Sequence, residues 1–308
     1  MPTTHGPGDS AGLLAICQST DVYAEERRAL WTRTWLPVGR ADELPGPGHY
    51  FTWEATGVPL LIVRGVDGEV RAFYNSCRHR GAPVVREASG RNRALRCQYH
   101  SWTYDTFGKL VSVPDERDFV DLRHEERSLV GVGVRLADGW VLVCEHPDEA
   151  PDPLTLPALG GLRAVERRRR PVAANWNVLA AVMAGTTEGL APVTIESAGF
   201  NGIAIRSGAH GLAAFAWPVG VWPGRHGESE LRVTVLAPEW DDEDDAPAES
   251  PEWQAFAASA SGWSDAVAAK AEATQSEVTA GAVPEAFRSG LAQHPALAAF
   301  LSAAAAGP

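Results

Sequence analysis

The chain has little lysine, little cysteine and no long apolar run, and each shortage narrows what it can be. Lysine occurs only at Lys109 and Lys270, so arginine supplies almost all of the positive charge. Lysine and arginine together number 27 against 39 acidic residues, which gives a net charge of −12 and leaves no basic footprint for nucleic acid. Because no stretch approaches the roughly 18 consecutive apolar residues of a membrane span, the sequence predicts no spanning helix.

Two of the four cysteines, Cys17 and Cys144, are not expected to bind a metal. Cys144 lies in the apolar run GWVLVCEH (139–146), and we expect a buried, inert thiol there. Cys17 ends the run LLAIC (13–17), which faintly resembles a lipoprotein cleavage site, but no lysine or arginine precedes Arg27. The cationic part of a signal peptide is therefore missing. We expect a cytoplasmic protein, in which cysteine serves metals more often than disulfides.

The other two cysteines stand beside histidines, as Cys77-x-His79, then 17 residues, then Cys97-x-x-His100. Two thiolates and two neutral imidazoles suit a Rieske-type [2Fe-2S] cluster, in which each pair holds one iron. A zinc site can use the same donors. Zinc fingers usually group cysteine with cysteine and histidine with histidine, however, whereas each half-site here has one of each. Four unrelated structural residues are the remaining interpretation.

The segments CRHRGAP (77–83) and CQYHSWTYDTFGKL (97–110) resemble the Rieske domain of the ring-hydroxylating oxygenases, the Rieske non-haem iron oxygenase α-subunit family. The residues that follow the family's order are Trp102, Tyr104, Asp105, Gly108 and Leu110. Ser101 stands where the family usually has glycine. The resemblance implies that Cys77, His79, Cys97 and His100 bind the cluster. It is strong over residues 21–148 and weak beyond residue 165.

Secondary-structure signals divide the chain into four parts. Residues 1–35 contain a predicted helix over 21–35, with Asp21 as a plausible N-cap, which is expected to pack on the C-terminal domain. Residues 36–148 alternate short β-strand signals with Gly and Pro turns and predict an antiparallel β Rieske domain. Residues 149–164 are rich in proline and predict a linker. For residues 165–308, the resemblance implies an oxygenase-like, catalytic-type domain.

The last of these parts contains strand-like runs at 192–197, 201–206, 212–217 and 231–237, followed by a long amphipathic helix at 252–280. The predicted fold class is therefore α+β. An N-terminal antiparallel Rieske domain precedes a helix-grip (START-like) domain, whose antiparallel sheet grips the long C-terminal helix, as the family implies. The arginine run at 167–170 is expected to be a solvated face or an edge strand protected by charge, with a partner contact as the alternative.

The family resemblance also implies a mononuclear Fe(II), bound by two histidines and a carboxylate. These ligands follow an N-W-K segment, which corresponds to Asn175, Trp176 and Asn177. In the family's register, the acid that bridges to a neighbouring subunit's cluster falls on Gly185. The positions of the three iron ligands fall on Glu188, on Val193 and near Ala268. The sequence therefore predicts that the iron site is degenerate.

A shift of register does not restore this site, because no histidine lies between His146 and His210. We expect no mononuclear iron and no catalytic residue in this chain. A relocated iron site that uses His210 and His226 is the alternative.

Three functions remain open. The first is an electron-transfer accessory subunit of a hetero-oligomeric Rieske oxygenase, a mixed trimer or a hexamer of two trimers, that passes electrons to the iron of a catalytic α subunit. His100 would face the acidic bridge of that partner. A ferredoxin or flavin reductase would supply the electrons, with Arg78, Arg80 and Arg86 tuning the local field or docking an acidic ferredoxin. The second is a self-contained oxygenase, hydroxylating or demethylating its substrate at a relocated iron site. The third is a redox-sensing or structural pseudo-oxygenase.

Overall fold

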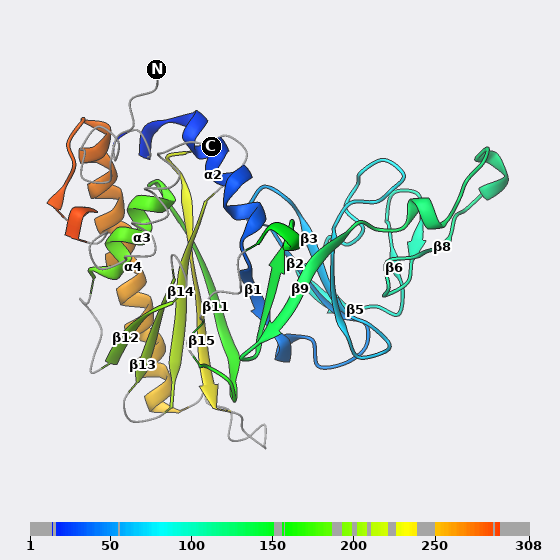
Figure 1. Ribbon diagram of the computed structural model, residues 1–308. Coiled ribbons are helices and arrows are strands. Elements are labelled where there is room, and N and C mark those ends of the chain that lie inside the picture. Colours follow the sequence, from blue (N-terminus) through cyan, green and yellow to red (C-terminus); the bar gives the residue numbers. More distant parts are fainter. Residues whose placement is uncertain are drawn as a thin grey trace. The chain divides into compact units, whose positions relative to one another are not determined.

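The computed structural model describes residues 14, 17–54, 56–150, 156, 158–186, 193–198, 202–207, 211–220, 226–238, 250–285 and 287–289. The chain divides into two compact units, one formed by Met1–Trp31 with Leu154–Pro308 and the other by Thr32–Pro153. Both contain antiparallel sheets, and a long helix lies near the C-terminal end of the first (Figure 1). The predicted α+β class is therefore confirmed. Among the described residues, no helix combines the length and apolar character that a membrane span requires.

The unit Thr32–Pro153 is built from two antiparallel sheets. The larger has the order β1-β10-β9-β4-β3-β2-β5 and the smaller the order β6-β7-β8. Their strands are β1 (Leu36–Arg40), β2 (His49–Trp53), β3 (Leu60–Arg64), β4 (Val70–Tyr74), β5 (Ser89–Arg91), β6 (Leu95–Arg96), β7 (Thr103–Tyr104), β8 (Leu110–Ser112), β9 (Gly131–Ala137) and β10 (Trp140–Cys144). Short 3-10 turns lie at Trp31–Arg33, Ala41–Glu43, Glu116–Asp118, Glu125–Arg127 and Pro147–Glu149. As expected, Cys144 is buried.

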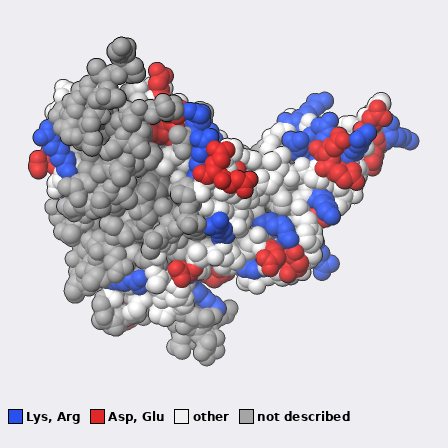
Figure 2. All heavy atoms as spheres, viewed as in Figure 1, with Lys and Arg blue, Asp and Glu red and all other residues white. Residues whose placement is uncertain are grey.

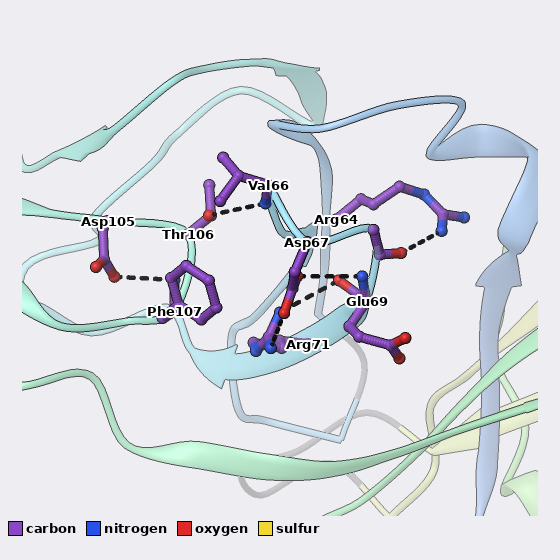
Figure 3. Close-up of polar contacts among 9 residues, drawn as sticks. Arg64, Val66, Asp67, Glu69, Arg71, Asp105, Thr106 and Phe107 are labelled. Atoms are coloured by element: carbon purple, nitrogen blue, oxygen red, sulfur yellow. Dashed lines mark hydrogen bonds and ion pairs between the residues drawn. The ribbon is translucent and has the colours of Figure 1, made fainter.

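The hairpin that joins β3 to β4 braces the turn that follows β7 (Figure 3). The backbone N–H of Val66 donates to Thr106 Oγ1 at 3.4 Å. Arg71 pairs with Asp67 at 2.6 Å, and its guanidinium carbon lies 4.5 Å from the centre of the Phe107 ring. These contacts connect the larger sheet to the smaller sheet, whose β6–β7 loop carries Cys97 and His100.

The unit formed by Met1–Trp31 and Leu154–Pro308 has one five-stranded antiparallel sheet, in the order β11-β15-β14-β13-β12. The strands are β11 (Leu162–Val172), β12 (Val193–Ala198), β13 (Gly202–Ser207), β14 (Ala213–Gly220) and β15 (Ser229–Pro238). Helix α3 (Trp176–Ala184) contacts β13, β14 and β15, and helix α4 (Pro251–Thr279) contacts β11, β15 and α3. Strand β11 begins at Leu162, two residues before the expected end of the linker at residue 164. It is an edge strand and contains the arginine run, as predicted.

Helix α4 agrees closely with the prediction for residues 252–280. The Ser250 side chain caps its first turn by accepting from the backbone N–H of Trp253, and Pro251 occupies the first helical position. Trp253, Trp263 and Val267 are among its buried residues. The amphipathic repeat was therefore enough to predict this helix.

The prediction for the N-terminal helix was wrong at both ends. Helix α2 spans Thr20–Ala29, and the residues after Leu30 form a 3-10 turn. Ser19 rather than Asp21 is the N-cap, because its hydroxyl accepts from the backbone N–H of Val22 at 3.2 Å. Asp21 instead lies in the first turn, where its negative charge suits the helix dipole.

A buried carboxylate connects α2 to α3. Glu26 is 2% exposed and accepts hydrogen bonds from Trp176 Nε1 and Asn177 Nδ2, each at 2.9 Å. Asn175 caps α3 by accepting from the backbone N–H of Asn177 at 2.8 Å. Burial raises the pKa of Glu26 to about 7, and the two hydrogen bonds oppose this rise. The Asn-Trp-Asn segment is therefore a packing centre of this unit.

The raised pKa of Glu26 predicts that this unit is less stable at higher pH. Between an unfolded value near 4.5 and a folded value of about 7, the folded state keeps a proton that the unfolded state has lost. The free energy of unfolding should therefore fall across this window, by at most roughly 3 kcal/mol. Urea unfolding followed by tryptophan fluorescence at pH 5 to 8 measures the effect.

Glu26→Gln should remove most of this pH dependence. Glu25→Gln, on the same helix and more exposed, is the matched control and should retain it. Equal pH dependence in the wild type and in Glu26→Gln would contradict the role of the buried carboxyl group.

Candidate metal centre

Two loops bring the predicted cysteines and histidines together. The loop from β4 to β5 carries Cys77 and His79, and the loop from β6 to β7 carries Cys97 and His100. The ring centres of His79 and His100 are 4.6 Å apart, and the thiols of Cys77 and Cys97 are close enough to interact directly. Although each half-site contains one cysteine and one histidine, the fold regroups them into a thiol pair and an imidazole pair.

The first loop is closed by its own backbone. The N–H of Cys77 donates to the carbonyl of Ala82, and the N–H of Gly81 donates to the carbonyl of Cys77, both at 2.8 Å. The Asn75 side chain holds the far end of this loop at Val85. Its oxygen accepts from the backbone N–H of Val85 at 3.1 Å, and its amide donates to the carbonyl of the same residue. Gly81 has a φ of +76°, which favours glycine.

The second loop repeats this arrangement. The N–H of Cys97 donates to the carbonyl of Trp102, and the N–H of Ser101 donates to the carbonyl of Cys97, both at 2.9 Å. Ser101 occupies the position equivalent to Gly81 and has a φ of +60°. A left-handed backbone explains why glycine suits this position. Arg96 Nη2 donates to Ser101 Oγ at 2.8 Å, which helps to hold the serine there.

The thiols are buried, and one of them is in contact with a tyrosine. Cys77 is 3% exposed and Cys97 is 2% exposed. The hydroxyl oxygen of Tyr104 lies 3.3 Å from Cys77 Sγ and accepts from the backbone N–H of Arg78 at 3.0 Å. Its proton is therefore available to the sulfur. Burial raises the pKa of the Cys77 thiol, and the Tyr104 hydroxyl opposes this rise.

The two imidazoles have different surroundings. His79 is half-buried and stacks on Trp102, with ring centres 4.9 Å apart and planes 8° apart, whereas His100 is exposed. Burial lowers the pKa of His79, and His100 and then Arg80 contribute to the decrease. His79 Nδ1 is buried and has no hydrogen-bond partner among the described residues. A neutral imidazole with a free buried nitrogen is what a metal ligand requires.

This donor set fits a [2Fe-2S] cluster better than a single zinc ion. Within the described ranges, no three His, Cys, Asp or Glu side chains are arranged to hold one metal ion. A binuclear cluster needs only two ligands for each iron, and the thiol pair and imidazole pair supply them. An open hollow of about 680 Å³ adjoins the first loop and is lined in part by Cys77, His79 and Pro83.

The positions that the family register assigns to the mononuclear iron site lie only partly within the described residues. Gly185 is the C-cap of α3, Val193 is the first residue of β12, and Ala268 is buried on α4. Glu188 and His210 lie outside the described residues. The ring of His226 lies edge-on to that of Tyr23, with centres 6.5 Å apart.

Three aromatic residues near the candidate ligands had no assigned role in the sequence interpretation. Trp102 immediately precedes β7 and Tyr104 lies in it, two positions later, a spacing that places side chains on one face of a strand. That alternation could have indicated that both support the cluster loops. Phe119 follows a 3-10 turn in an irregular segment, and no periodicity indicates its contact with His79.

Comparison with known proteins agrees with this geometry. A family model described as "Rieske [2Fe-2S] domain" matches residues 34–128. The chain is 36% identical to the α subunit of biphenyl 2,3-dioxygenase from Rhodococcus jostii over 132 residues. This aligned stretch covers 42% of this chain and 28% of the relative. It is 41% identical over 90 residues to the oxygenase subunit of glycine betaine monooxygenase from Chromohalobacter salexigens, or 29% of this chain and 20% of the relative. These matches span less than a third of either relative.

Solved structures share the fold over most of the chain. The apo form of CntA, a quaternary ammonium Rieske monooxygenase, superposes with a TM-score of 0.73 and 18% identity, covering 95% of this chain and 93% of CntA. Naphthalene 1,2-dioxygenase from a Rhodococcus species gives a TM-score of 0.62 and 20% identity, covering 84% and 82% of the two chains. The shared fold includes both units.

The chain is therefore a Rieske [2Fe-2S] domain protein. Together with the matched domain, the named relatives confirm the resemblance to Rieske oxygenase α subunits that the sequence shows.

A matched pair of substitutions tests the loop geometry. Gly81→Ala puts a side chain at φ +76°, where the nearest side-chain atom would be Ser76 Oγ at 3.7 Å, so the cost is backbone strain of about 1–2 kcal/mol and not a clash. Ser101→Gly relieves the equivalent strain but removes the bond from Arg96. We expect chelator to remove iron faster from Gly81→Ala than from the wild type, and no faster from Ser101→Gly. The loss of the visible absorbance measures the rate. Equal acceleration in both variants would contradict the equivalence of the two loops.

Proposed function

We propose that this chain is the electron-transfer subunit of a hetero-oligomeric Rieske oxygenase. Cys77 and Cys97 bind one iron of its [2Fe-2S] cluster, and His79 and His100 bind the other. The observation that carries this assignment is the regrouping of the four side chains into a thiol pair and an imidazole pair, with the buried His79 Nδ1 available as a ligand.

The bound cluster supplies one electron at a time, at a potential within roughly −150 to +300 mV. The protein contributes the surroundings of that cluster. The buried thiols lie away from water, and the Tyr104 hydroxyl donates toward Cys77 Sγ. His100 is the exposed ligand, so it faces the acidic residue of a partner subunit and forms the exit route for the electron.

The electron acceptor lies in another chain because this chain lacks the side chains for it. The family positions for the bridging acid, the second histidine and the third ligand fall on Gly185, on Val193 and near Ala268, none of which can bind iron through its side chain. Glu188 alone cannot form a site with two histidines and one carboxylate. The partner is a catalytic α subunit with an intact site, in a mixed trimer or a hexamer of two trimers.

The electron donor is a ferredoxin or a flavin reductase in the cytoplasm. Arg78, Arg80 and Arg86 are exposed on the first loop or just after it. Within the described part of the chain, none of the three has an ion-pair partner, so an acidic donor is attracted to this side of the cluster. Figure 2 shows that acidic and basic side chains are mixed over the coloured part of the visible face.

A self-contained oxygenase is the second candidate. The fold shared with CntA, a monooxygenase, over 95% of this chain favours it. It requires an iron site at positions other than those of the family register.

Metal analysis of the anaerobically purified protein tests the cluster. We expect two irons and two acid-labile sulfides per chain, and a Rieske-type electron paramagnetic resonance signal after reduction. Cys97→Ser should lose the signal, because one thiolate cannot hold its iron. A third iron in stoichiometric amount, with oxygen consumed and product formed, would favour the self-contained oxygenase. Zinc in place of iron would contradict both candidates.

Co-expression with a catalytic α subunit tests the electron-transfer role. We expect a mixed complex, and Cys97→Ser in this chain should lower its turnover severalfold because the electron path is broken. Glu188→Gln is the matched control and should have little effect. If the mixed complex forms and Cys97→Ser leaves its turnover unchanged, the electron-transfer role is excluded.

A further inference from the structure

The segment 113–128 connects β8 to β9 and is called the arm here; it follows β8 in Figure 1. Asp115 and Asp121 have left-handed backbones, with φ of +51° and +56°, on either side of Phe119. The Phe119 side chain is half-buried against the core of this unit, while the adjacent Val120 is 91% exposed. The arm therefore turns one apolar side chain inward and leaves its neighbour in water.

Phe119 contacts the side of the metal centre that carries His79. Its ring centre lies 5.7 Å from that of His79, with planes 83° apart, and 5.6 Å from that of Trp102, with planes 75° apart. Trp102 already covers one face of His79 by stacking. Phe119 packs edge-to-face beside this stack, so the His79 imidazole has aromatic neighbours on two sides.

The base of the arm is fastened by one histidine. His124 Nδ1 lies 3.0 Å from the carbonyl oxygen of Leu110, and its Nε2 lies 2.8 Å from Glu116 Oε1. His124 thus ties the first residue of β8 to the first 3-10 turn of the arm. Arg127 Nη1 also donates to the carbonyl oxygen of Arg78 at 3.3 Å, which joins the end of the arm to the first loop.

We propose that Phe119 is a positioning residue for His79, which holds the rotation of the imidazole and keeps water away from the histidine-bound iron. This inference rests on the proposed cluster ligands and is independent of the accessory-subunit role.

The charge of the cluster determines in which direction the loss of Phe119 should shift the reduction potential. Two ferric ions, two sulfides and two thiolates sum to zero, and one added electron makes the reduced cluster negative. Water stabilises the charged form, so removing an apolar cover should stabilise the reduced cluster and raise its potential. A freely turning imidazole should also change the electron paramagnetic resonance spectrum.

The test compares Phe119→Ala, Phe119→Leu and Val120→Ala in the full-length protein with its cluster. We expect Phe119→Ala to shift the potential upward, to alter the resonance spectrum and to speed reoxidation of the cluster by oxygen severalfold. Phe119→Leu keeps an apolar cover and should shift the potential less. Val120→Ala is the matched control on the same arm and should behave as the wild type. A Phe119→Ala protein with full iron content and an unchanged potential and spectrum would overturn the proposal.

A second variant tests the arm without altering the His79 contact. His124→Ala removes both ties at the base of the arm, and we expect an upward potential shift smaller than that of Phe119→Ala. If Phe119→Ala fails to retain iron, Phe119→Leu and His124→Ala decide the question, and unchanged potentials in both overturn the proposal. A wrong ligand assignment is distinguishable, because the wild type itself would then lack the Rieske-type signal.

Discussion

The metal centre depends on one constraint: two loops twenty residues apart must present both thiols inward while their histidines lie side by side. Each loop meets it with the same pair of backbone hydrogen bonds around its cysteine and with a left-handed residue four positions later. Each cysteine and its histidine lie in one short closed loop, so the backbone of that loop positions the thiol and the imidazole together. The rest of this unit supports the loops.

That support comes from several directions. Strands β3 and β4 extend into a hairpin that braces the turn after β7, so both cluster loops are attached to one framework. Tyr104 and Trp102 extend from the second loop toward the side chains of the first, and the arm adds Phe119. The result is asymmetric, because His79 has aromatic rings on two sides and His100 is exposed.

The other unit shares its fold with the solved Rieske oxygenase structures, while the proposed register places Gly185, Val193 and Ala268 at or near the positions of the bridging acid and of two iron ligands. Its sheet, α3 and α4 are held by apolar packing and by Glu26, which binds the Asn-Trp-Asn segment. None of these interactions needs iron, so the fold can persist without that metal. A shared fold alone therefore says little about whether this chain activates oxygen. The chemistry has to be argued from the side chains at each site.

The sequence by itself determined the α+β class and helix α4, and it predicted several strands of both units and the four candidate ligands, because apolar periodicity and close Cys–His spacing are local signals. It misplaced the cap of α2, where Ser19 and Asp21 are both suitable residues and only the hydrogen bond decides. The tertiary structure alone decided that thiol meets thiol and imidazole meets imidazole, that Glu26 is buried against Trp176, and that Phe119 covers His79. These contacts join residues 20 to 150 positions apart, or residues in irregular loops, and no local pattern encodes such distances.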